Sequence, residues 1–285
     1  MEWDIFLLQG FNTALIIGVL VLVSLGLGII YGLMNVLNLA HGEFLMLGAY
    51  GVVVGNMLGL GVWVGILLGA VSVGIIGYFL ERSLISRLYG RPIDALLATW
   101  GLSLMFQQAV RLIFGPEPKP VVSPIEGAVE IFGLPFPIYK LVVLIITIGV
   151  TLGVLAIFRF PTFGIKTRAV LQDWEMAQCL GIASPPIYSL SFAIGAGLSG
   201  LAGGLIAPLI TVQPFMGPVF VVRGFLTVIV GGVGTLLGVV GGASVIGGAE
   251  GIVAYFGSSV GAQVVVLTIA IIIVRLRPQG IFSRR

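Results

Sequence analysis

Long stretches without charged residues alternate with short polar segments along the chain. No residue between Asp4 and His41 carries a charge, and the same holds between Phe44 and Leu80. A helix needs about 20 apolar residues to cross the hydrocarbon core of a membrane. The first stretch therefore predicts one span with a further short segment, and Gly59-Leu60-Gly61 divides the second stretch into two short spans.

The rest of the chain continues this pattern. Further spans are predicted at residues 95–112, 141–158 and 188–210, and the region 225–274 is apolar except for Glu250. Non-helical backbone is tolerated at membrane depth where it is buried in protein or lines a cavity, and we expect such breaks at Gly231–Gly234 and Gly241–Gly242. The prediction is an all-α, polytopic transmembrane bundle of about 8–9 membrane segments with broken or re-entrant helices, forming a single transmembrane domain over residues 1–285.

Basic residues are concentrated in three segments between the predicted spans. These are residues 81–94, residues 159–175 and the C-terminal tail, whereas the loop 115–140 has no such excess. Because cytoplasmic loops carry an excess of Lys and Arg, the three basic segments are expected in the cytoplasm and the loop 115–140 outside. The N-terminus is then expected outside and the C-terminus inside.

Composition narrows the class of protein. Hydrophobic residues make up 58% of the 285 residues and charged residues 9%, against about 25% charged residues in soluble domains. Lys and Arg lie between hydrophobic runs rather than in one patch, so the net charge of +3 does not indicate nucleic-acid binding. A single cysteine, Cys179, and a single histidine, His41, predict neither an intramolecular disulfide nor a metal site.

Glycines recur at every fourth position in several predicted spans. The series are Gly51, Gly55 and Gly59; Gly61, Gly65 and Gly69; Gly200 and Gly204; Gly234, Gly238 and Gly242; and Gly247 and Gly251. This spacing places each series on one helix face, where the missing side chain allows two backbones to approach closely. The pattern predicts a compact bundle of short, tightly packed helices, as in a transporter.

Two groups of polar residues interrupt the apolar sequence. Asn35, Asn38, His41 and Glu43 lie between two apolar runs, and Thr99, Trp100, Ser103 and Gln107 lie in the fourth predicted span. The first group predicts a broken helix that faces a water-filled path, with an ordinary interfacial loop as the alternative. The second is interpreted as a polar stripe lining a path for a small neutral solute, with interhelical hydrogen bonding as the alternative.

Arg223 and Glu250 are charged residues within apolar sequence. A charge at the bilayer centre costs at least about 2.5–3.5 kcal/mol on insertion scales, so each is expected to be paired, at an interface or in a transport path. Arg223 follows a proline-rich turn and is expected near the external surface, and Glu250 is expected near a helix end. Neither a P-loop nor the H-E-x-x-H and G-x-S-x-G signatures occur, which predicts a protein without catalytic residues or its own ATPase activity.

The polar segment 166–181 has the pattern of an amphipathic helix. Val170, Trp174 and Ala177 fall on one helical face, and Pro185-Pro186 ends the element. Such a helix between two spans can dock into a groove on a cytoplasmic partner or lie on the lipid surface.

Within this segment, residues 175–181 resemble the E-A-A-x-x-x-G loop by which permease subunits of ABC importers contact their ATPases; Met176 departs from the pattern. The segments 31–43, 230–234 and 277–282 also resemble signatures of the branched-chain amino acid and urea permease family. The resemblance implies coupling to the ATPases through Arg168, Asp173, Glu175, Ala177 and Gly181. It further implies a second paralogous permease, two ATP-binding subunits, a periplasmic binding protein and a place in the bacterial inner membrane.

Residues 96–111, residues 168–182 and the Arg-Pro-Gln-Gly tail resemble the urea branch of this family more closely. The resemblance thus implies a permease subunit that imports urea or short amides by alternating access, with ATP and Mg bound by the partner ATPases and no cofactor bound by this chain. A branched-chain amino acid permease is the alternative within the family. A stand-alone channel for a small neutral solute is the alternative of another class.

Overall fold

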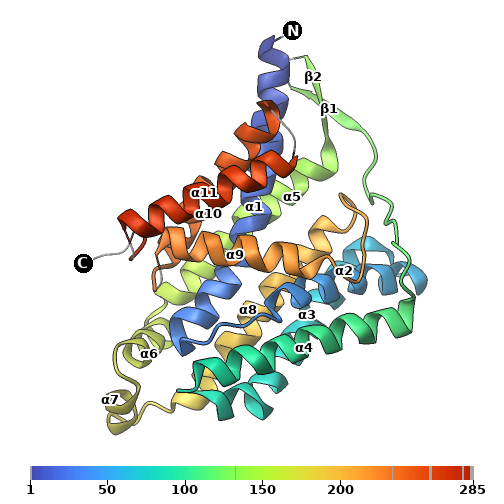
Figure 1. The fold of residues 1–285 in the computed structure, drawn as a ribbon. Coiled ribbons are helices and arrows are strands. Elements are labelled where there is room, and N and C mark those ends of the chain that lie inside the picture. The colour runs from blue at the N-terminus through green and yellow to red at the C-terminus, as the bar shows by residue number, and fades with distance from the viewer. Residues whose placement is uncertain (1, 132, 233, 257–258, 278, 283–285) are drawn as a thin grey trace.

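The computed structural model describes residues 2–131, 133–232, 234–256, 259–277 and 279–282. The chain is almost entirely helical, as the hydrophobic pattern predicts (Figure 1). In chain order the elements are α1 (Glu2–Met34), α2 (His41–Met57), α3 (Gly61–Ser83), η1 (Ile85–Leu88), α4 (Pro92–Phe114), β1 (Ala128–Ile131), β2 (Leu134–Pro137), α5 (Ile138–Arg159), α6 (Pro161–Gln172), α7 (Trp174–Cys179), α8 (Ser184–Ile206), α9 (Gly217–Gly231), α10 (Leu236–Phe256) and α11 (Ser259–Leu276).

Within the described residues, six helices are long and apolar enough to cross a membrane: α1, α3, α4, α5, α8 and α10. Helices α9 and α11 are apolar but shorter, and α2 has 17 residues. The predicted all-α, polytopic bundle is confirmed. The starts and ends of the predicted spans differ from those of the helices by only a few residues, because long apolar runs leave little choice of helix position.

Helices α1 and α8 form the centre of the bundle. Two thirds of the apolar window of each is buried, against about a fifth for α4 and α5. Leu22, Leu25 and Ile30 of α1 and Phe192 and Leu205 of α8 are among the most completely buried side chains. The outer helices expose apolar side chains instead, which is the arrangement a lipid environment permits.

Glycine-lined contacts hold α2 against α3 and α8. A Cβ atom added to Gly51 would lie 2.5 Å from the Cα of Gly69, and one added to Gly55 would lie 2.6 Å from the Cα of Gly65. On α8, a Cβ atom added to Gly203 would lie 1.8 Å from the carbonyl oxygen of Leu45. The predicted use of the four-residue glycine spacing for close packing of backbones is confirmed between α2 and α3, whereas Gly203 lies outside the predicted series.

The helical path is interrupted at residues 35–40, 207–216 and 232–235. Asn35 has a positive φ of 50°, and Gly232 and Gly234 have φ values of 100° and 93°. The expected break at Gly231–Gly234 is therefore found, although Val233 lies outside the described residues. The expected break at Gly241–Gly242 is wrong: both residues lie inside α10, where a Cβ atom on Gly242 would lie 2.2 Å from the Thr227 carbonyl oxygen, so this glycine serves packing against α9.

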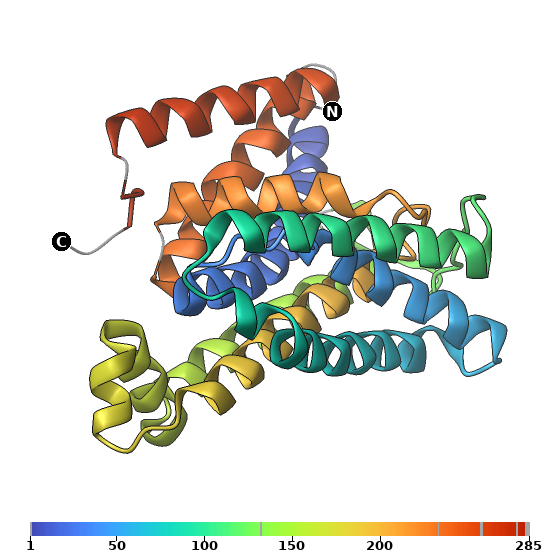
Figure 2. The same ribbon diagram turned by 60° about the horizontal axis from the view of Figure 1, so that its bottom comes forward.

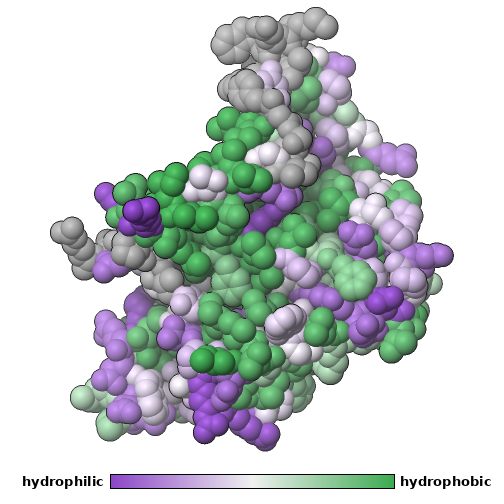
Figure 3. All heavy atoms as spheres, in the orientation of Figure 1, coloured by the Kyte–Doolittle hydropathy of each residue, from purple (hydrophilic) through white to green (hydrophobic). Residues whose placement is uncertain are grey.

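The three basic segments lie toward one side of the molecule. In Figure 2 the α3–α4 connection, α6–α7 and the end of α11 point to the left, and the α2–α3 turn and the segment after α4 point to the right. The antiparallel β1–β2 hairpin packs near the start of α1, where the rings of Phe11 and Phe136 are 5.0 Å apart. On the face shown in Figure 3, hydrophobic residues predominate between these two ends.

Candidate functional site

Glu43 is a fully buried carboxylate at the start of α2. The hydroxyl of Ser103 and the amide nitrogen of Gln107 donate hydrogen bonds of 2.9 and 2.8 Å to its Oε1 atom. Gln107 also donates to the Ser103 hydroxyl oxygen at 3.2 Å. The polar positions of α4 therefore join this helix to the start of α2, across 60 residues of sequence.

The starts of α2 and α9 meet at this carboxylate. A Cβ atom on Gly42 would lie 2.2 Å from the carbonyl oxygen of Gly217, and one on Gly217 would lie 2.6 Å from Oε2 of Glu43. This Oε2 atom has no hydrogen-bond partner among the described residues. Helix N-termini favour negative charge, so the two glycines allow a carboxylate to approach two helix starts inside the bundle.

The rest of the α1–α2 break is braced by buried hydrogen bonds. Nε2 of His41 lies 3.0 Å from the Val23 carbonyl oxygen, which fits the tautomer protonated at Nε2. The Thr99 hydroxyl accepts from the Leu39 backbone N–H at 3.2 Å, and Asn38 Oδ1 accepts from the Ala40 N–H at 3.0 Å. These bonds fix the non-helical backbone that the change of direction leaves without helical partners.

The predicted polar residues thus divide into two sets. Asn38, His41, Glu43, Thr99, Ser103 and Gln107 are buried together at the α1–α2 break. Asn35 is exposed at the turn itself, and Trp100 is 54% exposed on the outer face of α4. The contacts of the buried set fit interhelical hydrogen bonding; that these side chains line a transport path stays a prediction.

A second buried carboxylate, Glu81, was not singled out from the sequence. The hydroxyls of Tyr89 and Ser189 donate to its two oxygens, and burial, followed by the hydrogen bond to Glu81, raises the pKa of Tyr89, so this hydroxyl remains a donor at neutral pH. The position of Glu81 at the end of an uncharged run was the available signal. Its partners lie on η1–α4 and α8, which no local pattern links to it.

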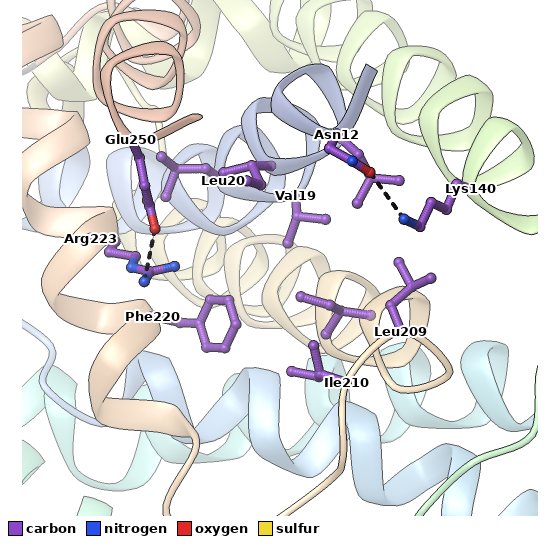
Figure 4. Close-up of a pocket in the computed structure, with 12 residues that line it drawn as sticks. Asn12, Val19, Leu20, Lys140, Leu209, Ile210, Phe220, Arg223 and Glu250 are labelled. Atoms are coloured by element: carbon purple, nitrogen blue, oxygen red, sulfur yellow. Dashed lines mark hydrogen bonds and ion pairs between the residues drawn. The ribbon is translucent and has the colours of Figure 1, made fainter. Parts of the chain in front are cut away.

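A cavity of about 310 Å³ opens between α1, α5, α9, α10 and the end of α8. Figure 4 shows its polar groups at two ends with apolar side chains between them. It is lined by Asn12, Leu15, Ile16, Val19, Leu20, Lys140, Ile206, Leu209, Ile210, Phe220, Arg223 and Glu250. In the same orientation as Figure 1, hydrophilic atoms are visible in a recess of the hydrophobic surface near α9 (Figure 3).

The charged groups of this cavity are partnered. Nη2 of Arg223 lies 2.9 Å from Oε1 of Glu250, with side-chain exposures of 24% and 12%. At the other end, the Lys140 ammonium donates to Asn12 Oδ1 at 3.0 Å. Each residue was expected to be paired, at an interface or in a transport path, and the structure pairs the two with each other. Glu250 lies within α10 rather than near its end. Asn12 and Lys140 were missed, because only the fold brings the start of α1 to the start of α5.

The segment 166–181 forms two helices, α6 and α7, instead of the single amphipathic helix expected. Asp173 between them is extended, with φ −160° and ψ 105°, and its carboxylate accepts a 2.9 Å hydrogen bond from the Met176 N–H. Aspartate favours this N-cap position. The break changes the helical phase, so Val170 and Ala177 are buried against Ile187 while Trp174 is exposed.

The α6–α7 segment protrudes at one end of the bundle (Figure 1). Leu171, Trp174, Met176 and Leu180 are all at least 40% exposed, and Glu175 lies among them. Arg168 donates to the Phe158 carbonyl oxygen at 3.1 Å, which ties α6 to the end of α5. Gly181 ends the segment with a φ of 79° that favours glycine. An exposed apolar surface of this kind marks a site of interaction with another protein or a membrane.

The long apolar helices define a polytopic helical membrane protein. Residues 10–275 match the family described as "Branched-chain amino acid transport system / permease component", and the chain belongs to this family. The permease protein LivH of Salmonella typhimurium, named for high-affinity branched-chain amino acid transport, is 29% identical over 74% of each chain. BraD of Pseudomonas aeruginosa, named for the same transport, is 29% identical over 65% of each chain.

A paralogous type of permease also matches. LivM of Escherichia coli K12, named as a permease protein of the same transport system, is 24% identical over 76% of this chain and 56% of its own length. No solved structure matched the chain. The comparisons support a multi-pass membrane permease, and they do not support the urea branch that the sequence motifs suggested.

Proposed function

We propose that this chain is one permease subunit of an ATP-driven importer for branched-chain or similar apolar amino acids. The observation that carries the proposal is the family match over residues 10–275, to a family described by this transport. The partners would be a second, paralogous permease, two ATP-binding subunits and a periplasmic binding protein. ATP and Mg would be bound by the ATPase subunits, and this chain would act by alternating access.

The structure also weakens the argument for urea. That argument used the uncharged hydroxyl and amide groups of α4 as the lining of a neutral path. Ser103 and Gln107 instead bond to a buried carboxylate, and Thr99 bonds to the backbone of the α1–α2 break. The described cavity near α9 carries charged groups at its ends, which could interact with the two charges of a zwitterion.

Coupling to the ATPases would run through α6 and α7. Their exposed apolar side chains surround Glu175, and the buried Val170 and Ala177 attach the segment to α8. A helix that presents an apolar face can dock in a groove of a partner. Because α6 is also bonded to the end of α5 by Arg168, a displacement of this segment would be transmitted to two membrane helices.

The substrate is tested by uptake in cells that express the complete set of subunits. Radiolabelled leucine and radiolabelled urea are each offered alone and in competition with unlabelled leucine, urea and acetamide. We expect uptake of leucine that requires this chain and that urea does not reduce. Uptake of urea that leucine does not reduce would contradict the proposed substrate and return the chain to the urea branch.

A further inference from the structure

The Arg223–Glu250 pair and the groups opposite it have the composition of a site for a free amino acid. We propose that the cavity between α1, α5, α9 and α10 binds the zwitterion of an apolar α-amino acid. Arg223 would bind its carboxylate and Glu250 its ammonium group. This inference rests on the proposed function and assigns the substrate a position in this chain. The volume of the cavity, about 310 Å³, is at the small end of the range of about 300–1,000 Å³ for ligand pockets.

The ion pair leaves binding capacity for a ligand. One guanidinium nitrogen and one carboxylate oxygen make the 2.9 Å contact, so Arg223 retains further N–H donors and Glu250 a second oxygen. A ligand carboxylate beside the guanidinium and a ligand ammonium beside Glu250 would place each charge next to an opposite one. The charges of Arg223, Glu250 and the two ligand groups would then alternate in sign, so that each has an opposite neighbour. A ligand with only one charge would leave this arrangement with an unbalanced charge at a largely buried site.

The apolar part of the cavity fits the rest of such a ligand. Val19, Leu20 and Phe220 lie between the ion pair and the far end of the cavity (Figure 4). The aliphatic side chain of a ligand would be buried against these residues, which favours binding. Nothing in this part of the lining offers a hydrogen bond to a polar side chain, so apolar amino acids are favoured over polar ones.

Lys140 gives the cavity an excess of positive charge. Two cations, Arg223 and Lys140, face one anion, Glu250, among the lining residues, which favours entrance of a ligand with its carboxylate foremost. Arg223 and Glu250 also line a second cavity of about 370 Å³ toward α11, together with Val222 and Leu226. The ion pair therefore lies between two apolar spaces and is accessible from both.

The experiment uses the complete importer in proteoliposomes, with labelled leucine and with isocaproate and isoamylamine, which lack the ammonium and the carboxylate respectively. Arg223→Gln and Glu250→Gln are expected to lower leucine uptake about tenfold or more. The charge-swapped double variant Arg223→Glu, Glu250→Arg retains an ion pair and is expected to recover the thermal stability of the complex without recovering leucine uptake.

Lys140→Met keeps the ion pair intact and is expected to raise the KM for leucine with little change in kcat. Lys119→Met, which removes an equal charge outside the cavity, is the matched control and should behave as wild type. Neither isocaproate nor isoamylamine should compete with leucine in the wild type.

Leucine uptake at the wild-type rate by the charge-swapped variant, or equal competition by either analogue, would overturn the proposal and leave the pair a purely structural contact. A wild-type complex that imports no leucine at all would instead contradict the proposed function.

Discussion

Ser103 and Gln107 are donors to a carboxylate that lies at the junction of three helices. Oε1 of Glu43 receives both bonds, and the glycines of the α2 and α9 starts permit its approach. Removing one donor leaves this buried acceptor with a single hydrogen bond, and the loss of such a bond costs about 1–3 kcal/mol. These side chains therefore hold α4 to the α1–α2 break, a contact that α4 otherwise makes with few buried residues.

Gln107→Leu is expected to destabilise the protein by about 1–3 kcal/mol, because Oε1 of Glu43 loses its amide donor. Gln108→Leu is the matched control: Gln108 is exposed on the same helix, and its replacement should change stability little. Thermal unfolding in detergent, followed by the loss of monodisperse protein, measures both. Equal melting temperatures for the two variants would show that the buried network contributes nothing.

The sequence predicted the polar residues at this scale but not their partners. Periodicity in α4 put Thr99, Ser103 and Gln107 on one helix face, and all three are buried. The contacts of Ser103 and Gln107 with Glu43, and of Asn12 with Lys140, join residues that lie 60 or more positions apart. No local pattern reports such contacts, so the sequence alone favours neither the interhelical nor the pathway interpretation of the stripe.

Helices α2, α3 and α8 depend on glycine wherever their backbones touch. Gly203→Ala would place a methyl group 1.8 Å from the Leu45 carbonyl oxygen, and overpacking of this kind costs about 1–3 kcal/mol. Gly149→Ala in α5 adds the same methyl group where no atom lies within 4 Å. We expect a clear loss of thermal stability for the first variant and none for the second. A melting temperature unchanged by Gly203→Ala would contradict this packing.

The α6–α7 segment shows what the sequence missed at the scale of elements. A single helical face was expected through Trp174, but Asp173 caps a new helix and resets the phase. A side chain that caps a new helix, as Asp173 does, competes with continuation of the preceding helix. The contacts of Val170 and Ala177 with α8 favour the capped break over a continuous helix. Span positions, by contrast, followed from the long apolar runs alone.

Gly181 ends the segment in a left-handed conformation, which asparagine tolerates and valine does not. In the complete importer, Gly181→Val is expected to reduce leucine-stimulated ATP hydrolysis by about tenfold through strain at the end of α7. Gly181→Asn should retain most of it. The measurement is the ATPase rate in proteoliposomes with and without leucine. Equal coupling in both variants would show that this turn plays no part in transmission.

At the scale of the molecule, the basic segments lie toward one side (Figure 2), and we predict that this side faces the cytoplasm. The single cysteine, Cys179, is exposed in α7. Its accessibility from each side of the membrane therefore tests this orientation directly. When this chain is expressed without the ATPase subunits, a membrane-impermeant maleimide should label Cys179 in inverted membrane vesicles and leave it unlabelled in intact cells. Cys179→Ser is the control for background. Labelling in intact cells would reverse the proposed orientation.

ATP-driven import is tested most directly by accumulation of labelled leucine in proteoliposomes that contain the complete importer. ATP is supplied on the side of the ATPase subunits, and leucine with its binding protein on the other. We predict that leucine accumulates above its external concentration with ATP and does not cross without it. Equilibration of leucine across the membrane in the absence of ATP would contradict an ATP-driven permease and indicate a channel.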